Sequence, residues 1–290
     1  MRDVPAPCHG TKLRGTKLRR PLPTDPRTLP PLEPIFGTTL DAGLSDLGLE
    51  LRPEVRVAIE AQARLLLGWS DSVNLSAHRT PERIAREHVI DSLTALPLLE
   101  GTASLLDLGS GAGYPGLPLA LALSVERVAL VDSIGKKVRF LEVAAAAALK
   151  ELQGAAHEAP DPAGRPAPAF SALKARAEDL ARQPAQREAW DAVTARAVAP
   201  MAELLELSLP LLRIGGRLVA WKRDDGAGSL ERELAAARDI GQACGGASPS
   251  LHRVTARGLE DHRLVVIVKR RATPREFPRP VAERRRALLR

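Results

Sequence analysis

The chain has 290 residues, of which 44% are hydrophobic, so it can bury a substantial core, and no apolar run approaches the ~18 residues of a membrane span. Its formal charge of +7 is concentrated at the two ends: residues 1–36 carry seven Lys/Arg against three Asp/Glu, and residues 269–290 carry nine against two. Residues 37–268 are therefore mildly acidic, with a net charge of −4. Basic ends of this kind either contact nucleic-acid phosphates or only keep the chain in solution.

The cysteines and the N-terminus indicate the compartment. Cys8 and Cys244 are the only two cysteines, too few and too far apart for a disulfide framework or a zinc site. Residues 1–20 are basic and contain several prolines, but they lack the apolar centre of a secretory signal. We therefore expect a cytoplasmic protein without a metal site.

Two segments precede the first predicted strand. Residues 1–36 contain many prolines and no hydrophobic period, which predicts a disordered basic extension. Apolar residues then recur at three- and four-residue steps between Val55 and Leu67, as on one face of a helix. Thr80 offers an N-cap for a further helix. Residues 37–99 are therefore predicted to form an N-terminal helical cap.

From residue 100 onward, short apolar strands alternate with helices. Strands are predicted at 105–108, 127–132, 170–173, 190–196 and 217–222, with helices at 117–123, 136–152, 201–212 and 229–243. Two last strands, near 252–256 and 263–269, have no helix between them. Alternation implies a mostly parallel, doubly wound sheet, and the final pair implies an antiparallel hairpin at its edge. The expected fold class is α/β, with a Rossmann-like sheet over residues 100–270.

Three smaller features complete the predicted organisation. Residues 154–169 are rich in proline and poor in apolar anchors, which predicts a disordered surface insertion. Residues 271–290 form a basic C-terminal tail. Gly215 and Gly216 are predicted to end the helix at 201–212, because glycine is the usual residue after a helix C-terminus.

The loop after the first predicted strand carries the strongest functional signal. Behind Asp107, the glycines Gly109, Gly111 and Gly113 follow a G-x-G-x-G spacing, and Tyr114 occupies the third glycine position of the dinucleotide fingerprint G-x-G-x-x-G. Glycines accept φ > 0 and let a ligand approach the backbone closely. The loop resembles the first motif of class I S-adenosylmethionine-dependent methyltransferases, where it wraps the methionine part of the cofactor. A tight turn without a ligand remains the alternative.

Other candidate residues follow from their place at strand ends or on a helix. Asp132 ends the second strand, 23 residues after Gly109, where an acid can accept hydrogen bonds from ribose hydroxyls. Arg196 ends the fourth strand, at the edge where open α/β sheets bind ligands, although a structural ion pair is the alternative. His88 and Asp91 lie three residues apart on one helix face. They line an acceptor pocket, orient Arg196, or only pack the cap.

Motifs for several methyl acceptors are missing. Methylation of pyrimidine C5 needs a covalent nucleophile, usually Cys, and neither cysteine lies at a strand end. Methylation of exocyclic amines typically uses a [DN]-P-P-[YF] motif after the fourth strand, and Thr194 to Val198 stands there instead. Guanine N7 carries an in-plane lone pair and loses no proton, so it requires no general base. These absences are compatible with N7 chemistry, and the sequence indicates no catalytic side chain.

An ordered set of motifs makes a resemblance specific. The segments are Asn74–Ala77, Glu87–Leu93, Asp107–Gly116, Asp132–Leu141 and Ala195–Ala197. Together, over roughly residues 40–270, they resemble the family of ribosomal RNA small-subunit methyltransferase G, also called the glucose-inhibited division protein B family. The resemblance implies N7-methylation of one guanine in 16S rRNA of the small ribosomal subunit, with S-adenosylmethionine as donor. We expect a monomer without a membrane partner.

The resemblance and the loop spacing together predict a cofactor site. Its residues are Gly109, Gly111, Tyr114, Asp132, Ser133, Ala177, Glu178 and Arg196. The resemblance places Ala177 and Glu178 at the adenine end and Asp132 and Ser133 in the ribose region. From the residues alone, Glu178 at the start of a helix is equally a favourable partner of the helix dipole.

Three other functions remain open on the sequence. A small-molecule methyltransferase would normally need a larger apolar lid than residues 40–99 offer, and it leaves the basic ends unexplained. An NAD-dependent oxidoreductase is disfavoured by Tyr114 at the third glycine position. A non-catalytic RNA-binding protein that keeps the fold would not need the glycine loop.

Overall fold

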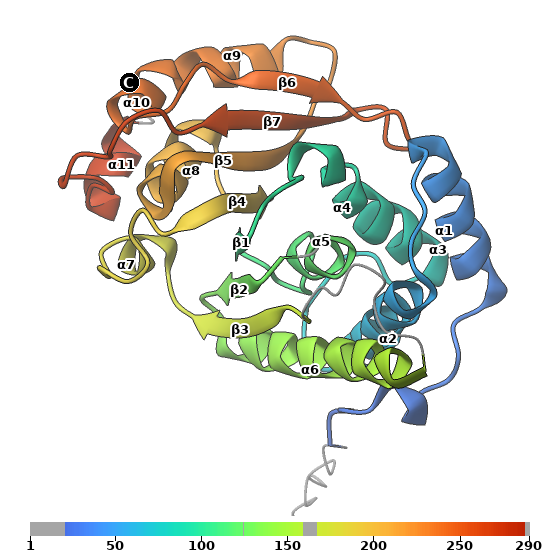
Figure 1. Cartoon of the computed structure of the whole chain (residues 1–290). Helices are drawn as coiled ribbons and strands as arrows, with labels where there is room; N and C mark the ends of the chain where they lie inside the picture. The colour runs from blue at the N-terminus through green and yellow to red at the C-terminus, as the bar shows by residue number, and fades with distance from the viewer. Residues whose placement is uncertain (1–20, 124, 159–166, 288–290) are drawn as a thin grey trace, which may run out of the picture.

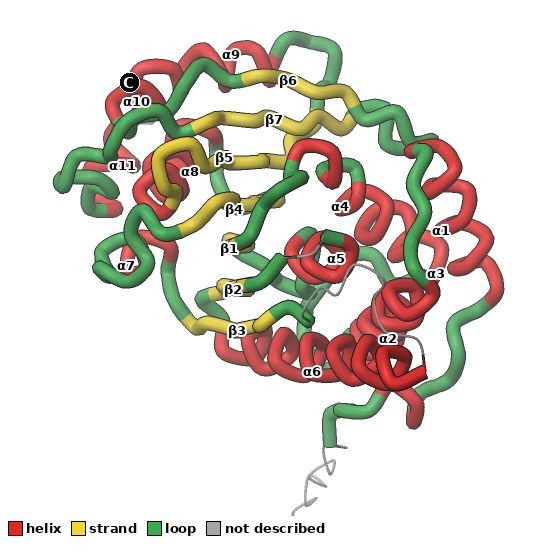
Figure 2. The backbone as a smooth tube through the Cα atoms, in the orientation of Figure 1, coloured by secondary structure: helices red, strands yellow, loops and turns green. Residues whose placement is uncertain are grey.

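The computed structural model describes residues 21–123, 125–158 and 167–287, and a single sheet runs through the centre of this part of the chain (Figures 1 and 2). Its strand order is β3-β2-β1-β4-β5-β7-β6. The strands are β1 Ser104–Leu108, β2 Arg127–Asp132, β3 Ala169–Lys174, β4 Trp190–Arg196, β5 Leu212–Arg223, β6 Ser250–Arg253 and β7 His262–Val268. Neighbours from β3 to β5 pair in parallel, and β7 is antiparallel to both β5 and β6. The expected α/β class with an antiparallel edge hairpin is confirmed.

Helices cover both faces of this sheet. On the strands, successive side chains point to opposite faces, so Leu105 joins one buried cluster and Leu106 joins the other. The first cluster packs under the N-terminal helices, and the second packs under the helices that follow β3 and β4. The α-helices between β1 and β6 are α5 Gly116–Ala122, α6 Gly135–Glu158, α7 Ala177–Leu180, α8 Met201–Ser208, α9 Ser229–Ala236 and α10 Arg238–Ala243. Burial on both faces explains the continuous apolar runs of β1 and β2.

The N-terminal helices form a cap over one face. They are α1 Pro34–Leu47, α2 Pro53–Trp69, α3 Pro81–Arg83, the π-helix η2 Ile84–Ile90 and α4 Asp91–Leu93. Three of them begin at a proline, whose fixed φ and missing N–H suit the first turn. The Thr80 hydroxyl accepts from the Arg83 N–H, as its predicted N-cap role requires. In Figure 1, α2 lies along α6 below the sheet, while α1 and α3 lie to its right.

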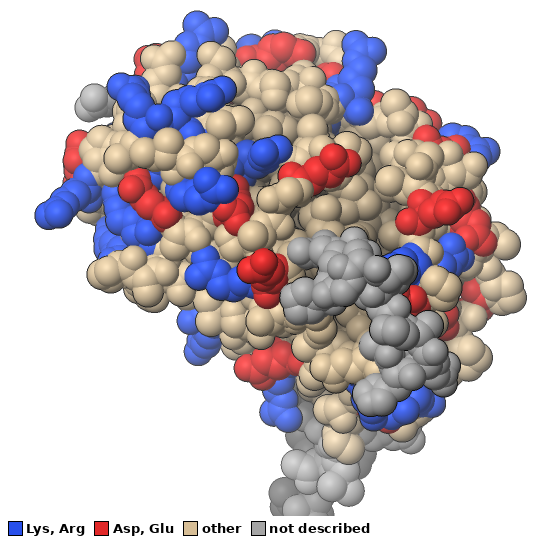
Figure 3. Space-filling model, viewed as in Figure 1, with Lys and Arg blue, Asp and Glu red and all other residues tan. Residues whose placement is uncertain are grey.

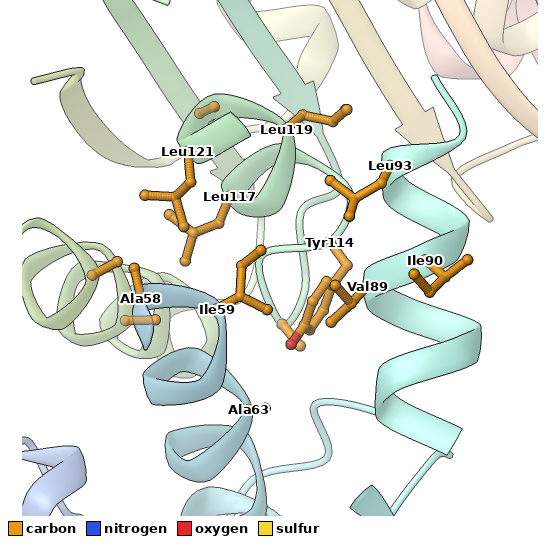
Figure 4. Packing of buried hydrophobic residues seen from close by; sticks show 14 of the residues in the cluster. Ala58, Ile59, Ala63, Val89, Ile90, Leu93, Tyr114, Leu117, Leu119 and Leu121 are labelled. Atoms are coloured by element: carbon orange, nitrogen blue, oxygen red, sulfur yellow. The ribbon is translucent and has the colours of Figure 1, made fainter. Parts of the chain in front are cut away.

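The cap and the glycine loop share one core. Figure 4 shows Ile59 of α2 and Val89 of η2 on either side of the Tyr114 ring, which comes from the loop between β1 and α5. Gln62 of α2 is fully buried, and its Nε2 donates to the Ala112 carbonyl at 2.9 Å. The cap therefore holds the glycine loop in place, because side chains of α2 and η2 pack against it and Gln62 bonds to its backbone.

The N-terminal extension is shorter than the sequence predicts. Residues 21–36, which belong to the predicted disordered segment, include the turn η1 Pro26–Thr28 and the start of α1. The Trp69 indole N–H donates to the Pro23 carbonyl at 2.7 Å, and the Arg64 guanidinium donates to the Pro30 carbonyl at 3.1 Å. Prolines that disfavour a helix still allow an extended strip to dock by its carbonyls. Residues 1–20 lie outside the described residues.

The predicted insertion and tail also differ from the structure. Residues 154–158 continue α6, and Ala169 starts β3, while residues 159–166 lie outside the described part of the chain. Residues 271–287 fold back onto the body and end in α11 Val281–Ala287. No described helix is both long and apolar enough to cross a bilayer.

Gly215 and Gly216 lie inside β5 rather than after a helix. The helix α8 ends at Ser208, a 3₁₀ turn follows, and β5 then begins at Leu212. A Cβ on Gly216 would lie 2.8 Å from the Asp191 carbonyl oxygen, at an irregularity in the pairing of β4 with β5. The glycine signal therefore marks a close approach of two strands, which local sequence does not distinguish from a helix end.

Candidate active site

A cavity of about 420 Å³ lies at the carboxyl ends of β1 to β4. The sites where proteins bind small molecules span roughly 300–1,000 Å³. Open doubly wound sheets bind ligands at this edge. The cavity brings together five of the eight predicted site residues: Gly109, Asp132, Ser133, Ala177 and Glu178.

The glycine loop forms one wall of the cavity. Gly109 has φ +68° and Gly111 has φ +56°, in the left-handed region that favours glycine. A Cβ on Gly109 would lie 2.8 Å from Cγ2 of Val198, so any residue other than glycine would crowd Val198 at the edge of the cavity. Gly111 does not line the cavity, but its N–H donates to Asp132 Oδ2 at 3.1 Å. This bond ties the loop to the end of β2.

Asp107 at the head of the loop has a structural role. Its carboxyl is fully buried, where it accepts from the Gly116 N–H at 3.1 Å and from the Thr194 hydroxyl at 2.7 Å. Burial raises the pKa of Asp107 to about 6. A Cβ on Gly116 would lie 2.6 Å from the Asp107 Cβ, so the first residue of α5 has to be glycine. The acid of the motif joins β1, β4 and α5.

Two carboxylates line the cavity from different strands. Asp132 accepts from the Ile134 N–H at 2.9 Å and from Gly111, and Lys137 Nζ lies 3.9 Å from its Oδ2. Glu178 begins α7 beside the end of β3. An ionised carboxylate has about four acceptor positions, so both groups retain capacity for ligand hydroxyls. These free acceptor positions beside the glycine loop fit a ligand that carries hydroxyl and amino donors.

Tyr114 does not line this cavity. Its side chain is 4% exposed, and its ring stacks on His88 with the centroids 4.7 Å apart and the planes 10° from parallel. The hydroxyl is buried and has no hydrogen-bond partner among the described residues. The assignment of Tyr114 to the cofactor stays a prediction, and it would have to act through the backbone of the loop.

Arg196 points toward the cap. Its guanidinium donates to the Glu87 carbonyl at 3.0 Å and to Asp91 Oδ2 at 2.7 Å, and it lies 3.0 Å from His88 Nδ1. It lines a second cavity of about 430 Å³, whose wall at residues 197–199 is shared with the first. His88 and Asp91 hold Arg196 in this position, and both also line the second cavity, so two of the alternatives stated for them occur together.

His88 is neutral in this arrangement. A guanidinium only donates hydrogen bonds, so the Nδ1 that faces Arg196 has to accept, and the ring proton sits on Nε2 toward the Ser76 hydroxyl at 2.6 Å. Burial, and then the charge of Arg196, lowers the pKa of His88 to about 2. Its acceptor nitrogen is therefore already used, and His88 is not available as a general base.

The structure adds residues that the sequence did not indicate. Val198 lies two positions after Arg196, packs against Gly109 and lines the first cavity. Val198 could have been predicted from the sequence, because the residues that follow a parallel strand line the edge where such sheets bind ligands. Val281 and Arg284 of α11 also line this cavity, and no local pattern connects them with β1.

Comparisons with known proteins decide the family. A family model described as rRNA small subunit methyltransferase G matches residues 57–161. The ribosomal RNA small subunit methyltransferase G of Roseiflexus sp. (strain RS-1) is 40% identical over 218 residues, which cover 74% of this chain and 84% of the relative. The chain belongs to the ribosomal RNA small subunit methyltransferase G family. The resemblance of the ordered motifs is thereby confirmed.

Further members of the family match over most of their length. The ribosomal RNA small subunit methyltransferase G of Moorella thermoacetica is 38% identical over 242 residues, covering 83% of this chain and 92% of the relative. Among solved structures, an O-methyltransferase from Bacillus cereus in complex with SAH is similar at 16% identity and a TM-score of 0.47, over 81% of this chain and all of that chain.

Proposed function

We propose that this protein transfers a methyl group from S-adenosylmethionine to N7 of one guanine in 16S rRNA. One observation carries the proposal: in a chain of this family, Gly109 of the glycine loop and the carboxylates Asp132 and Glu178 border one cavity at the carboxyl edge of the sheet. Family membership supports the acceptor, and the cavity supports the donor.

Each residue of the cavity has a role in this proposal. Gly109 lets the cofactor lie against the backbone, Asp132 accepts from its ribose hydroxyls, and Glu178 meets its adenine end. S-adenosylmethionine would supply the methyl group as an electrophile bonded to a sulfonium. The assignments of Ser133 and Ala177 to this site are part of the proposal, because both border the cavity.

The second cavity is the proposed place of the guanine. It adjoins the first across residues 197–199, and three contacts to the cap fix Arg196 in its wall. N7 attacks with its own lone pair and releases no proton, so the protein has to position the two reactants rather than supply a base. A neutral His88 with its acceptor nitrogen bonded to Arg196 agrees with this requirement.

The proposed partner is the RNA of the small ribosomal subunit, met by a monomer in the cytoplasm. On the face shown in Figure 3, Lys and Arg gather over the region where Figure 1 places α10 and α11. Arg270, Arg271 and Arg275, in the segment between β7 and α11, are exposed, and Arg271 donates to the Gln242 carbonyl of α10 at 3.1 Å. Sedimentation of the purified protein tests the monomer.

The proposal is tested with undermethylated small subunits and labelled S-adenosylmethionine. We expect the label to appear as 7-methylguanine at a single position of the 16S rRNA after digestion. Label on free small molecules but not on RNA would contradict the proposal and favour the small-molecule alternative. A thermal shift with S-adenosylhomocysteine and none with NADH is expected in parallel, since the loop carries Tyr114 where a dinucleotide site has glycine.

A further inference from the structure

The carboxyl-terminal segment 271–287 reaches the cofactor cavity. Val281 and Arg284 of α11 line it beside Glu178, Gly109 and Asp132, although at least 165 residues of sequence separate them from the glycine loop. In Figure 1, α11 lies next to α7 and α8 at the left edge of the molecule. A segment that composition alone presents as a basic tail thus forms part of the wall of the site.

Buried contacts hold this segment on the body. Arg279 donates through its guanidinium to Glu206 at 2.8 Å and 3.0 Å, and Glu206 is 1% exposed. The Arg187 guanidinium donates to the carbonyls of Thr273 and Phe277, each at 2.9 Å. These bonds to a buried carboxylate and to backbone carbonyls fix where α11 begins.

Arg284 lies between two acids at the end of this path. It is 3% exposed, its Nη2 lies 3.5 Å from Glu178 Oε1, and its Nε lies 3.3 Å from Glu203 Oε1. Its Nη1 donates to the Arg279 carbonyl at 2.6 Å. The guanidinium is therefore held from three directions, so its charge has a fixed position beside Glu178.

Glu178 needs such a partner. It belongs to a helix of four residues, Ala177–Leu180, and its side chain has three rotatable bonds, so fixing it costs conformational entropy. A fixed guanidinium removes that freedom before the ligand arrives, and it compensates the charge of Glu178 next to Glu203 and Asp132. Preorganisation of this kind increases affinity without a new contact to the ligand.

We propose that Arg284 is a positioning residue for the cofactor, which holds the Glu178 carboxylate ready to accept from the adenine end of S-adenosylmethionine. This inference rests on the proposed function, because it takes the cavity as the cofactor site. It makes the carboxyl-terminal segment part of the cofactor site, and it gives one of the basic residues near the C-terminus a role that does not involve RNA.

The test compares variants of the full chain by calorimetric titration with S-adenosylhomocysteine. Arg284→Ala should weaken binding about tenfold, the loss of one charge-assisted interaction. Arg284→Lys keeps the cation between the acids and should fold, with an affinity between those of the wild type and Arg284→Ala. Arg286→Ala, an exposed position on the same helix, should bind as the wild type does. The KM for RNA should stay unchanged in all three.

A double-mutant cycle separates positioning from a general structural role. If Arg284 acts through Glu178, then Arg284→Ala should cause little further loss in the Glu178→Gln background. An equal loss in both backgrounds, or wild-type affinity in both Arg284 variants, would overturn the inference. Either result would leave the proposed function intact, provided that the wild type methylates RNA and binds the cofactor. Failure of the wild type itself to bind S-adenosylhomocysteine would instead contradict the proposed function.

Discussion

At the scale of single residues, His88 and Arg196 form a pair that fits only one protonation state. Arg196 donates toward Nδ1, so a proton on that nitrogen would place two positive groups 3.0 Å apart in a mostly buried site. His88 also stacks on the buried Tyr114, and Arg196 also donates to Asp91. The junction between cap and sheet therefore depends on a neutral imidazole.

This dependence predicts how stability changes with pH. The pKa of His88 is about 2 in the folded chain and 6.5 for the free group, so the unfolded chain binds more protons between these values and the folded state loses stability as pH falls below 6.5. Asp107, whose pKa of about 6 is above its usual 3.8, acts in the opposite direction between pH 6 and 3.8. The wild type should therefore show a partly compensated profile.

His88→Asn isolates the histidine contribution, because an amide oxygen still accepts from Arg196 without titrating. Below pH 6.5 the wild type should lose stability relative to the variant by about 1 kcal/mol per pH unit. Urea unfolding at pH 7.5 and pH 5.5 measures the difference. Identical pH slopes for the two proteins would show that His88 is not the neutral buried group described above.

Among the elements of the fold, three different parts of the chain constrain the conformation of the loop between β1 and α5. Val198 closes on Gly109, Asp132 accepts from Gly111, and Gln62 lies where a Cβ on Gly113 would stand, at 2.9 Å. The spacing of the three glycines is therefore explained by contacts with the segment after β4, with β2 and with α2. The loop has a fixed shape before any ligand binds.

Gly109→Asp tests the placement of the cofactor. Asp tolerates a left-handed backbone better than most residues, so the main effect is a charged side chain in the space next to Val198 and Asp132, and binding of S-adenosylhomocysteine should be lost. Gly101→Asp is the matched control: its φ is +73°, yet nothing lies within 4 Å of an added Cβ. Calorimetry should find near-wild-type affinity for Gly101→Asp. Unchanged affinity for Gly109→Asp would disprove the location of the site.

At the scale of the whole molecule, the structure divides the basic residues near the C-terminus into two groups. Lys269 is fully buried beside Glu188, and Arg279 and Arg284 are bonded to acids of the body. Exposed arginines remain on the surface of the same region (Figure 3). Deleting the segment would therefore remove buried ion pairs together with any RNA contact, so single-site changes are the cleaner experiment.

Replacing Arg270, Arg271 and Arg275 by Gln should weaken RNA binding and reduce its salt dependence. Each lost phosphate contact lowers the slope of log K against log salt by about 0.7 for single-stranded RNA, so three lost contacts lower it by about 2. Arg257→Gln, a control whose side chain is 75% exposed and paired with Asp46, should leave the slope unchanged. An unchanged slope in the triple variant would mean that these arginines do not contact RNA.

The sequence was informative where one stretch of chain carries the constraint. The alternation of strands and helices, the glycine loop and the acid that ends β2 are local, because periodicity, φ > 0 and the end of a strand are properties of neighbouring residues. The family followed from the order of five short motifs. The same local reasoning was wrong for Gly215 and Gly216, where the constraint is a second strand.

Tertiary structure decided which side chains meet. The sheet and the polarity of its strands could be predicted from the sequence, since they depend on local conformation, and the proposed ligand edge with its glycine loop follows from that polarity. It did not determine that Tyr114 turns into the core, that Arg196 binds the cap, or that Arg284 reaches Glu178 from the far end of the chain. Those contacts join segments that are far apart in the sequence, so only the folded chain brings them together. In a buried site each charged side chain also needs a partner of opposite charge, and the fold decides which one it meets.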